Sequence, residues 1–339
     1  MLIRNEKTKR ILYLGIVSFL AIVISFIIFT LYNNSKPVIL NTKRIFSPLK
    51  EISTIDLNFE PSLTSLLPTG FFIKANGIQE ASLIDFDGVL VKKFISPYIE
   101  KKHAAIVSLG KIDSLYYMAD GNNATIFRKS INAKKFDTIK TNFNFSKVVV
   151  NEDYFLIQYT GLGKFENKLR FAKVTFRNGK VSSQNLNELN DLYDKIDYSG
   201  MLNSGSFISN GNVNFYVGSM NNNILAFNKM GKILFNKEAV YSVIKPEIII
   251  DKNSMSVGHS VITTTSLSVN QDYLYILSNI SDKRYKGKRV IDAYSTKDGS
   301  YIKSYVAPSQ ENKLATGIET DSKFLYLIYN DCIKKFITL

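Results

Sequence analysis

The pattern of hydrophobic and polar positions divides the chain into two parts. Residues Ile11–Tyr32 form 22 consecutive positions without a charge. At about 1.5 Å of rise per residue, a helix of that length spans about 33 Å, enough to cross a hydrocarbon core of about 30 Å. Beyond Gly70 the chain consists of short aromatic and β-branched runs bounded by Gly, Asn or Asp, a pattern typical of strands. The pattern therefore predicts one transmembrane helix followed by an all-β domain.

The charges before the apolar run predict its orientation. Residues 1–10 carry four basic side chains and one acidic side chain, and lysine and arginine favour the cytoplasmic side. We expect 1–10 to be a basic cytoplasmic tail and 11–32 to be a signal anchor in the lipid bilayer. The rest would then lie on the periplasmic or extracellular side. A cleaved signal peptide is the alternative, but its apolar region is normally about 7–15 residues and ends in small residues. Here the run is longer and ends in Phe29-Thr30-Leu31-Tyr32, which favours an uncleaved anchor.

The segment after the anchor has the composition of a tether. Four of the seven prolines of the chain fall between Asn33 and Gly70, and proline interrupts regular structure. Within this stretch, Glu51–Leu57 is rich in β-branched residues and predicts a strand. We therefore expect a tether over 33–50 and a folded domain over 51–339.

The strand-like runs recur along the folded domain. They begin at intervals of about 40–60 residues, a period found in repeat architectures such as propellers. The aromatic runs are Phe71–Ile73, Leu115–Tyr117, Tyr154–Ile157, Asn214–Val217, Tyr273–Ile276 and Phe324–Leu327. Several units therefore predict a β-propeller, with six blades as the best count.

A turn motif follows the aromatic run in four of these units. Glycine supplies the positive φ of tight hairpin turns, so each motif predicts an antiparallel hairpin. The motifs are Asp87-Gly88, Asn178-Gly179, Met230-Gly231 and Asp298-Gly299. The order of aromatic strand, second strand, turn and third strand matches strands two, three and four of a propeller blade.

The fifth unit carries the pattern in its fullest form, in Tyr273–Leu277, Ile291–Tyr294 and Asp298–Ile302. Together the units, over about 270 residues, resemble the six-bladed TolB-like and NHL-like propellers, which are common in exported bacterial proteins. The resemblance implies a fold and no particular activity. The third unit departs from it, because Asn185–Asp197 has the apolar spacing of a short amphipathic helix. The last unit lacks a fourth strand, and the strand at 51–57 could supply it and so leave no open edge.

Composition narrows the possible partners and chemistry. The net charge is +14, of which +11 lies beyond the anchor, so an extracytoplasmic protein or another anionic partner is expected. Nucleic acid is not expected in that compartment. The single cysteine, Cys332, excludes an intramolecular disulfide and lies in an apolar run that predicts burial. With two histidines far apart in the sequence, we expect no metal site and no cofactor.

Three sets of residues are candidates for chemistry. His259 lies in a polar loop and could face the central channel as an acid or base, or serve only as a loop residue. Asp85 and Asp87 could form a carboxylate pair, but a turn role explains them better. Five cations fall within seven residues and could bind an anion at one rim or form a solvated loop: Lys283, Arg284, Lys286, Lys288 and Arg289.

No catalytic motif is present, so the favoured function is a membrane-tethered, non-catalytic binding or scaffold module outside the cytoplasm. The alternative is an exported enzyme with a site in the central channel. The side chains that line the channel would distinguish the two.

Overall fold

The computed structural model describes residues 17–25, 43–78, 80–97, 105–161, 166–177, 179–243, 246–251, 254–258 and 261–338. Residues 17–25 are helical, and the rest of the Ile11–Tyr32 run lies outside the described residues. Among the helices that the structure describes, none is both long enough and apolar enough to cross a membrane. The N-terminal part up to Val38 and the part from Ile39 onward form two separate units.

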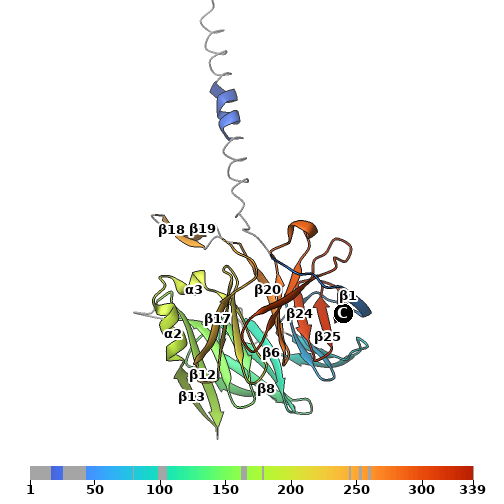
Figure 1. Ribbon diagram of the computed structural model, residues 1–339. Helices are drawn as coiled ribbons and strands as arrows, with labels where there is room; N and C mark the ends of the chain where they lie inside the picture. Colours follow the sequence, from blue (N-terminus) through green and yellow to red (C-terminus); the bar gives the residue numbers. More distant parts are fainter. Residues whose placement is uncertain are drawn as a thin grey trace, which may run out of the picture. The chain divides into compact units, whose positions relative to one another are not determined.

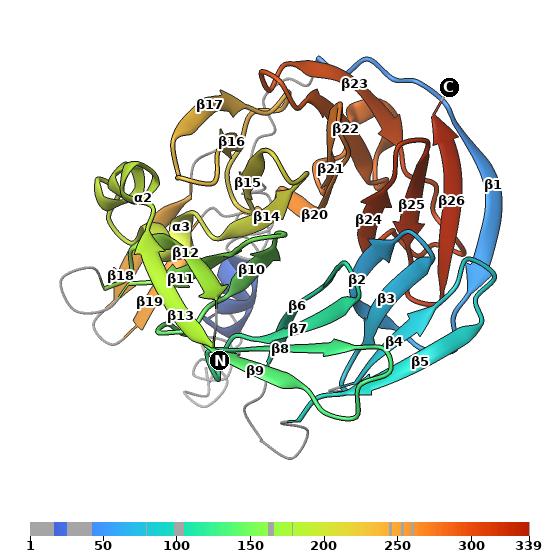
Figure 2. The ribbon, with the colours of Figure 1, turned by 90° about the horizontal axis from the view of Figure 1, so that it is seen from below.

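The second unit is a six-bladed β-propeller. Within the described residues, six four-stranded antiparallel sheets are arranged around a central axis, as Figure 1 and Figure 2 show. The innermost strands contact one another in the closed order β2, β6, β10, β14, β20, β24 and back to β2. The all-β propeller predicted from the repeats is confirmed.

Each blade is a four-stranded meander that runs from an innermost to an outermost strand. Blades 1, 2 and 3 contain β2 (Pro61–Leu67), β3 (Gly70–Ala75), β4 (Glu80–Ile84), β5 (Leu90–Ile95); β6 (Ile106–Ile112), β7 (Leu115–Asp120), β8 (Thr125–Ser130), β9 (Asp137–Lys140); and β10 (Lys147–Val150), β11 (Phe155–Thr160), β12 (Leu169–Arg177), β13 (Lys180–Asn185). Blades 4, 5 and 6 contain β14 (Gly205–Ser209), β15 (Asn214–Gly218), β16 (Asn223–Phe227), β17 (Ile233–Glu238); β20 (Thr264–Val269), β21 (Tyr273–Ser278), β22 (Val290–Ser295), β23 (Tyr301–Val306); and β24 (Gly317–Thr320), β25 (Phe324–Ile328), β26 (Cys332–Thr338), β1 (Leu49–Asp56).

The second strand of each blade accounts for the aromatic runs. Successive side chains of a strand point to opposite faces, and in a propeller both faces of a blade are covered by its neighbours. Phe71 packs toward blade 6, where its ring lies 5.3 Å from that of Tyr326. The next residue, Phe72, packs toward blade 2, with its ring 5.5 Å from that of Tyr116. Buried apolar clusters of this kind fill the junctions between neighbouring blades.

Turns between the third and fourth strands follow the predicted glycines. Gly88, Gly179, Gly231 and Gly299 all have φ between 71° and 83°. At the first of these turns, Asp85 Oδ1 accepts hydrogen bonds from the backbone N–H groups of Asp87 and Val89, at 3.0 and 2.8 Å. The turn interpretation of the pair is therefore confirmed, but the carboxylate that serves the backbone is that of Asp85, and Asp87 contributes its backbone N–H.

The ring closes through the N-terminal strand. β1 pairs antiparallel with β26, with Ile55 opposite Ile333, and so becomes the outermost strand of blade 6. This is the pairing that the missing fourth strand predicts. The two ends of the domain are thereby joined in one sheet (Figure 2).

The segment expected as a tether over 33–50 is ordered where the structure describes it. Residues 43–48 lie against blade 5, where Phe46 forms a bridge with Ser304 of β23. Arg44 is buried, because its guanidinium pairs with Asp292 of β22. The rest of the predicted tether, 33–42, lies outside the described residues.

Two insertions interrupt the blade repeat. Helices α2 (Asn187–Asp194) and α3 (Ser199–Leu202) lie between blades 3 and 4, where the sequence predicts a helix over Asn185–Asp197. The side chain of Asn190 holds α2 against β12 through two hydrogen bonds to the backbone of Phe171. A hairpin of β18 (Glu247–Asp251) and β19 (Ser254–Gly258), which pairs with no blade, lies between blades 4 and 5. A 3-10 turn, η2 (Lys283–Tyr285), lies between β21 and β22.

Candidate functional site in the central channel

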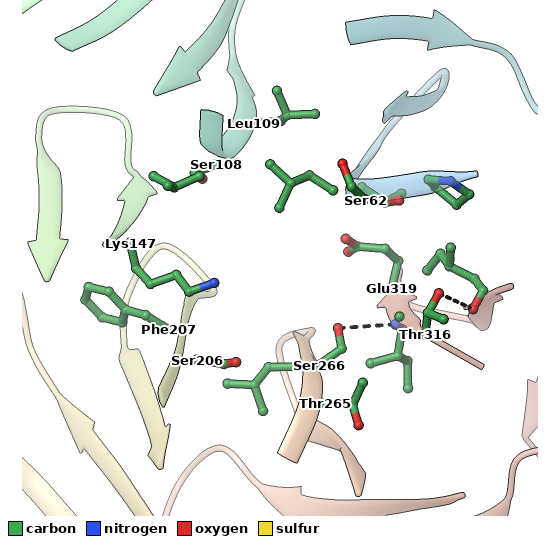
Figure 3. A pocket seen from close by; sticks show the side chains of 18 of the residues that line it. Ser62, Ser108, Leu109, Lys147, Ser206, Phe207, Thr265, Ser266, Thr316 and Glu319 are labelled. Carbon is green, nitrogen blue, oxygen red and sulfur yellow. Dashed lines mark hydrogen bonds between the residues drawn. The ribbon is translucent and has the colours of Figure 1, made fainter. Parts of the chain in front are cut away.

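The innermost strands enclose the candidate site. The N-terminal halves of these strands line a cavity of about 290 Å³, and their C-terminal halves line a continuation of about 390 Å³. The first volume is at the lower end of the range of small-molecule sites. Figure 3 shows the lining of the first cavity.

Every blade contributes a polar side chain to this cavity. Hydroxyl groups come from five blades, and blade 3 contributes an amine. The hydroxyl-bearing residues are Ser62, Thr64, Ser108, Ser206, Thr265, Ser266 and Thr316. Serine and threonine hydroxyls both donate and accept, so the cavity can form hydrogen bonds to a polar ligand from all sides.

Three ionisable residues occur on the six innermost strands: Lys111 on β6, Lys147 on β10 and Glu319 on β24. Since β24 and β10 are three places apart in the ring, Glu319 and Lys147 face each other across the channel. Both side chains point into the cavity in Figure 3. They do not form an ion pair with each other, so the space between them is open to a ligand.

Glu319 is held as a protonated acid at neutral pH. It lines both halves of the channel and lies between the neighbouring strands β2 and β20. Burial raises the pKa of Glu319 to about 8, although hydrogen bonds from the Leu66 backbone and the Ser268 hydroxyl oppose that shift. Desolvation therefore dominates, because it disfavours the charged form of a carboxyl group. A protonated carboxyl group can donate a hydrogen bond as well as accept one.

Lys147 supplies an amine that has no hydrogen-bond or ion-pair partner among the described residues. It is the first residue of β10, at the end of the channel lined by the N-terminal ends of the inner strands. Burial lowers the pKa of the Lys147 ammonium. An amine that is partly desolvated and has no protein partner is a group that a ligand can satisfy.

The second half of the channel contains the other lysine. Lys111 lines it together with the C-terminal ends of the inner strands. Its Nζ lies 5.4 Å from the ring centroid of Tyr116, a cation–π contact that already engages the charge. Lys147 is therefore the cation better placed to receive a ligand.

The lining does not resemble a hydrolytic site. Ser266 Oγ accepts a hydrogen bond from the backbone N–H of Ile318 at 3.3 Å, and this inter-blade contact explains its position. Nucleophilic catalysis by a hydroxyl needs an adjacent base. Among the described residues, no side-chain base is hydrogen-bonded to Ser266. In the described part of the chain, no group of three or more His, Cys, Asp or Glu side chains is arranged to hold a metal ion.

The basic loop of blade 5 does not act as one cluster of free cations. Arg284 pairs with Asp282 at 2.9 Å and stacks on Phe46, 4.7 Å from its ring centroid. Lys288 donates to Ser309, and Arg289 donates to the carbonyl of Ala315, where burial lowers the pKa of Arg289. Lys283 and Lys286 are exposed. Binding of an anion by this loop stays a prediction. Of the five cations of the loop, Lys283 and Lys286 are the two for which the described residues provide no partner.

The remaining predicted residues have simpler outcomes. Both histidines of the chain, His259 and His103, lie outside the described residues. Cys332 is buried and its thiol donates to Gln310 Oε1 at 2.8 Å, so the prediction of a packing role is confirmed.

Sequence reasoning missed Glu319 and Lys147. Their strands are short and mix polar with apolar residues, so they carry little of the strand signal of the aromatic runs. The sequence does contain a signal for them, because Glu319 and Lys147 are each the one ionisable residue of a strand that precedes an aromatic run. In a propeller that strand is innermost, so a lone charge there points to the channel.

Comparison with known proteins supports the fold. No protein-family model and no curated protein matches the chain. Among solved structures, it is similar to virginiamycin B lyase from Staphylococcus aureus, with 12% identity over 86% of this chain and 100% of that chain and a TM-score of 0.51. The fold is that of a propeller. The Pan2 WD40 domain of Neurospora crassa gives a TM-score of 0.53 at 6% identity, over 88% of this chain and 97% of that one. The Swd1 propeller domain of Myceliophthora thermophila gives 0.50 at 10% identity, over 86% and 100%. Identities this low establish the architecture and leave the activity to the site itself.

Proposed function

We propose that this protein is a membrane-tethered, non-catalytic binding module that takes a small polar ligand in its central channel, outside the cytoplasm. The single observation that carries this proposal is the channel lining, in which hydrogen-bonding groups from all six blades converge on an open cavity. A rigid ring of blades holds such groups in place without any further device.

The tether is supported by the sequence and by the exposed helix at 17–25. A helix that is apolar on all sides is stable in the core of a protein or in a membrane. The helix exposes large apolar side chains around its circumference: Val17, Phe19, Leu20, Ile22, Val23 and Ile24. The charges of 1–10 favour a cytoplasmic N-terminus.

The tether has a direct test. We expect the full chain to remain in the membrane after alkaline carbonate extraction, because a spanning helix is not released by high pH. Protease added to intact spheroplasts should digest the propeller only if it lies outside the cytoplasm. Exchange of Ile11–Tyr32 for an unrelated spanning helix should leave ligand binding unchanged. Release by carbonate, or protection of the propeller in spheroplasts that are still sealed, would contradict the proposed location.

Blocking the channel tests the site itself. Ser108 lines both halves of the channel, so Ser108→Phe should fill the space between Glu319 and Lys147. We expect this variant to lose binding of small polar ligands by at least about tenfold, because a bulky ring displaces them. Saturation-transfer NMR on a panel of small acids, sugars and amines measures this loss with the full chain in detergent.

Two matched variants make the result specific. Ser182→Phe places the same ring at an exposed position of β13, the outermost strand of blade 3, and should leave binding intact. The double variant Lys283→Glu/Lys286→Glu reverses the exposed charges of the basic loop. If the loop variant abolishes binding while Ser108→Phe retains it, the binding site is the rim and not the channel.

A further inference from the structure

Lys147 and Glu319 place an amine on one side of the channel and a carboxyl group on the opposite side. The two side chains approach the same cavity from opposing strands, without a direct ion pair, and hydroxyl groups separate them around the ring (Figure 3). We propose that the channel binds a small hydroxylated carboxylate, whose carboxylate pairs with Lys147 and whose hydroxyl groups face Glu319 and the surrounding serines and threonines. This inference rests on the proposed function of the channel as a ligand site.

The charge balance favours a monoanion. Among the described residues, Lys147 is the one cation that lines the first cavity, and a single ammonium compensates one negative charge. A phosphate dianion would leave a charge uncompensated in a partly desolvated site, which is costly. A neutral ligand would leave the partly desolvated ammonium unpaired.

The hydroxyl groups of the lining account for the rest of the ligand. A polar site selects a ligand hydroxyl because a ligand without it would leave the hydrogen-bonding groups of the protein unpaired. Thr64, Ser108 and Ser206 carry hydroxyls on three different blades that line the cavity. A polyhydroxylated chain can engage such groups around the ring, whereas an aliphatic acid of the same length cannot.

Glu319 makes the site sensitive to pH. In its neutral form it donates a hydrogen bond to the ligand, and in its ionised form it repels the carboxylate and attracts Lys147 itself. Among the strands that contact β24, β2 and β20 carry no ionisable side chain. β21 carries Tyr273 and Tyr275, and burial raises the pKa of Tyr275 above its ordinary value. β25 contributes Tyr326, whose hydroxyl donates to Asp321 Oδ2 at 2.9 Å, and burial raises the pKa of Tyr326 above its ordinary value, so it stays neutral. Lys111 and Lys147 face it from β6 and β10.

The sign of the pH dependence follows from the pKa of Glu319, which burial raises to about 8. Below that pH the carboxyl group is protonated and the ligand anion is accepted. As the pH rises through about 8 the proton is lost and the affinity for the anion falls. The change therefore falls in the alkaline range, above the ordinary titration range of glutamate.

The experiment compares gluconate with sorbitol, which has the same carbon chain without the carboxylate. Titrations of the full chain in detergent are followed by saturation-transfer NMR at about pH 6.5 and about pH 9.5. We expect gluconate to bind at least about tenfold more tightly than sorbitol at the lower pH, and to lose at least about fivefold in affinity at the higher pH. Lys147→Met should lose the preference for gluconate at both pH values, and Lys147→Arg should retain it. Glu319→Gln should show a smaller pH dependence than the natural chain, because glutamine keeps the neutral form. The pH dependence that remains in this variant reports the proton of Lys147, whose pKa burial lowers.

The outcomes separate this inference from the proposed function. If sorbitol and gluconate bind equally and Ser108→Phe removes both, the channel is a ligand site and the anion inference is wrong. If gluconate fails to bind up to about 10 mM while another panel compound binds in a manner blocked by Ser108→Phe, the inference is again wrong and the channel function stands. If gluconate binding survives Ser108→Phe, both proposals fail. Unchanged pH dependence in Glu319→Gln would overturn the role of Glu319.

Discussion

Replacing Arg44 with methionine is expected to destabilise the propeller by about 3–5 kcal/mol, because it leaves a buried carboxylate without its cation. The side chains of Arg44 and Asp292 are both fully inaccessible to solvent. Arg44 Nε and Nη2 donate to the two carboxylate oxygens of Asp292 at 2.9 and 2.7 Å, and Nη1 donates to the carbonyl of Ile280 at 2.6 Å. Chemical denaturation followed by circular dichroism measures the loss, since the chain has no tryptophan to report by fluorescence.

The pH dependence of this variant provides an internal check. Burial raises the pKa of Asp292, and in the natural chain the Arg44 guanidinium opposes that rise. Without Arg44 the folded variant holds a proton on Asp292 that the unfolded chain releases near pH 4, so stability falls as the pH rises above that value. The difference in free energy of unfolding between the natural chain and Arg44→Met should therefore be smaller at about pH 5 than at about pH 8. Equal losses at both values would contradict the assignment to an unpaired carboxylate.

Two further variants control for the change of residue type. Lys168→Met removes a cation from the ion pair with Asp197, whose side chain is 93% exposed, and should cost less than about 1 kcal/mol. Arg44→Met combined with Asp292→Leu removes both charges and should recover part of the loss, because an apolar pair needs no compensation. A double variant as unstable as Arg44→Met alone would show that the loss comes from packing and not from charge.

The blades could be predicted from the sequence because their central strands are buried on both faces. Phe71 and Phe72 face two different neighbouring blades, so the second strand reads as a continuous apolar run that stands out from the rest. The glycine turns are equally local, since Gly88 and the backbone bonds of Asp85 lie within a few residues of each other. Local signals of this kind repeat in each blade, which is why the repeat is visible without the structure.

The anchoring of the N-terminal segment could not be predicted in the same way. Arg44 and Asp292 are 248 residues apart, and neither lies in a pattern that marks it as buried. The prolines of 33–70 suggested a tether, yet Pro61 is the first residue of β2, a position that proline tolerates because the strand begins there. Composition therefore favours an irregular segment where the fold requires a docked one.

The channel residues could not be predicted for a different reason, since their arrangement depends on the closed ring. Glu319 and Lys147 lie far apart in sequence on short strands, and only the order of the six inner strands sets them opposite each other. The basic loop shows the opposite case, because five clustered cations form a strong sequence signal that the fold disperses. Arg284 turns to Asp282 and Phe46, and Arg289 turns inward to Ala315.

Ring closure leads to the second large effect, which is expected for Ile55→Ala. Ile55 lies on β1 opposite Ile333 and packs into the cluster between blades 6 and 1, with Phe71 and Ile328. Replacing a buried isoleucine with alanine lowers the free energy of unfolding by about 2–5 kcal/mol, through lost apolar burial and the cavity that remains. The cost is expected in the upper half of that range, because the cavity also weakens the strand that joins the two ends of the domain.

Ile52→Ala is the matched control for this prediction. Ile52 lies on the same strand and is the same residue type, but its side chain is 48% exposed. Its replacement should change the stability by no more than about 0.5 kcal/mol. Denaturation of both variants measures the difference, and hydrogen exchange on β26 shows where it arises. We expect faster exchange of the β26 amides in Ile55→Ala, because loss of β1 exposes the edge of β26 to water. If the two variants were equally stable, β1 would not be the strand that closes the ring in solution.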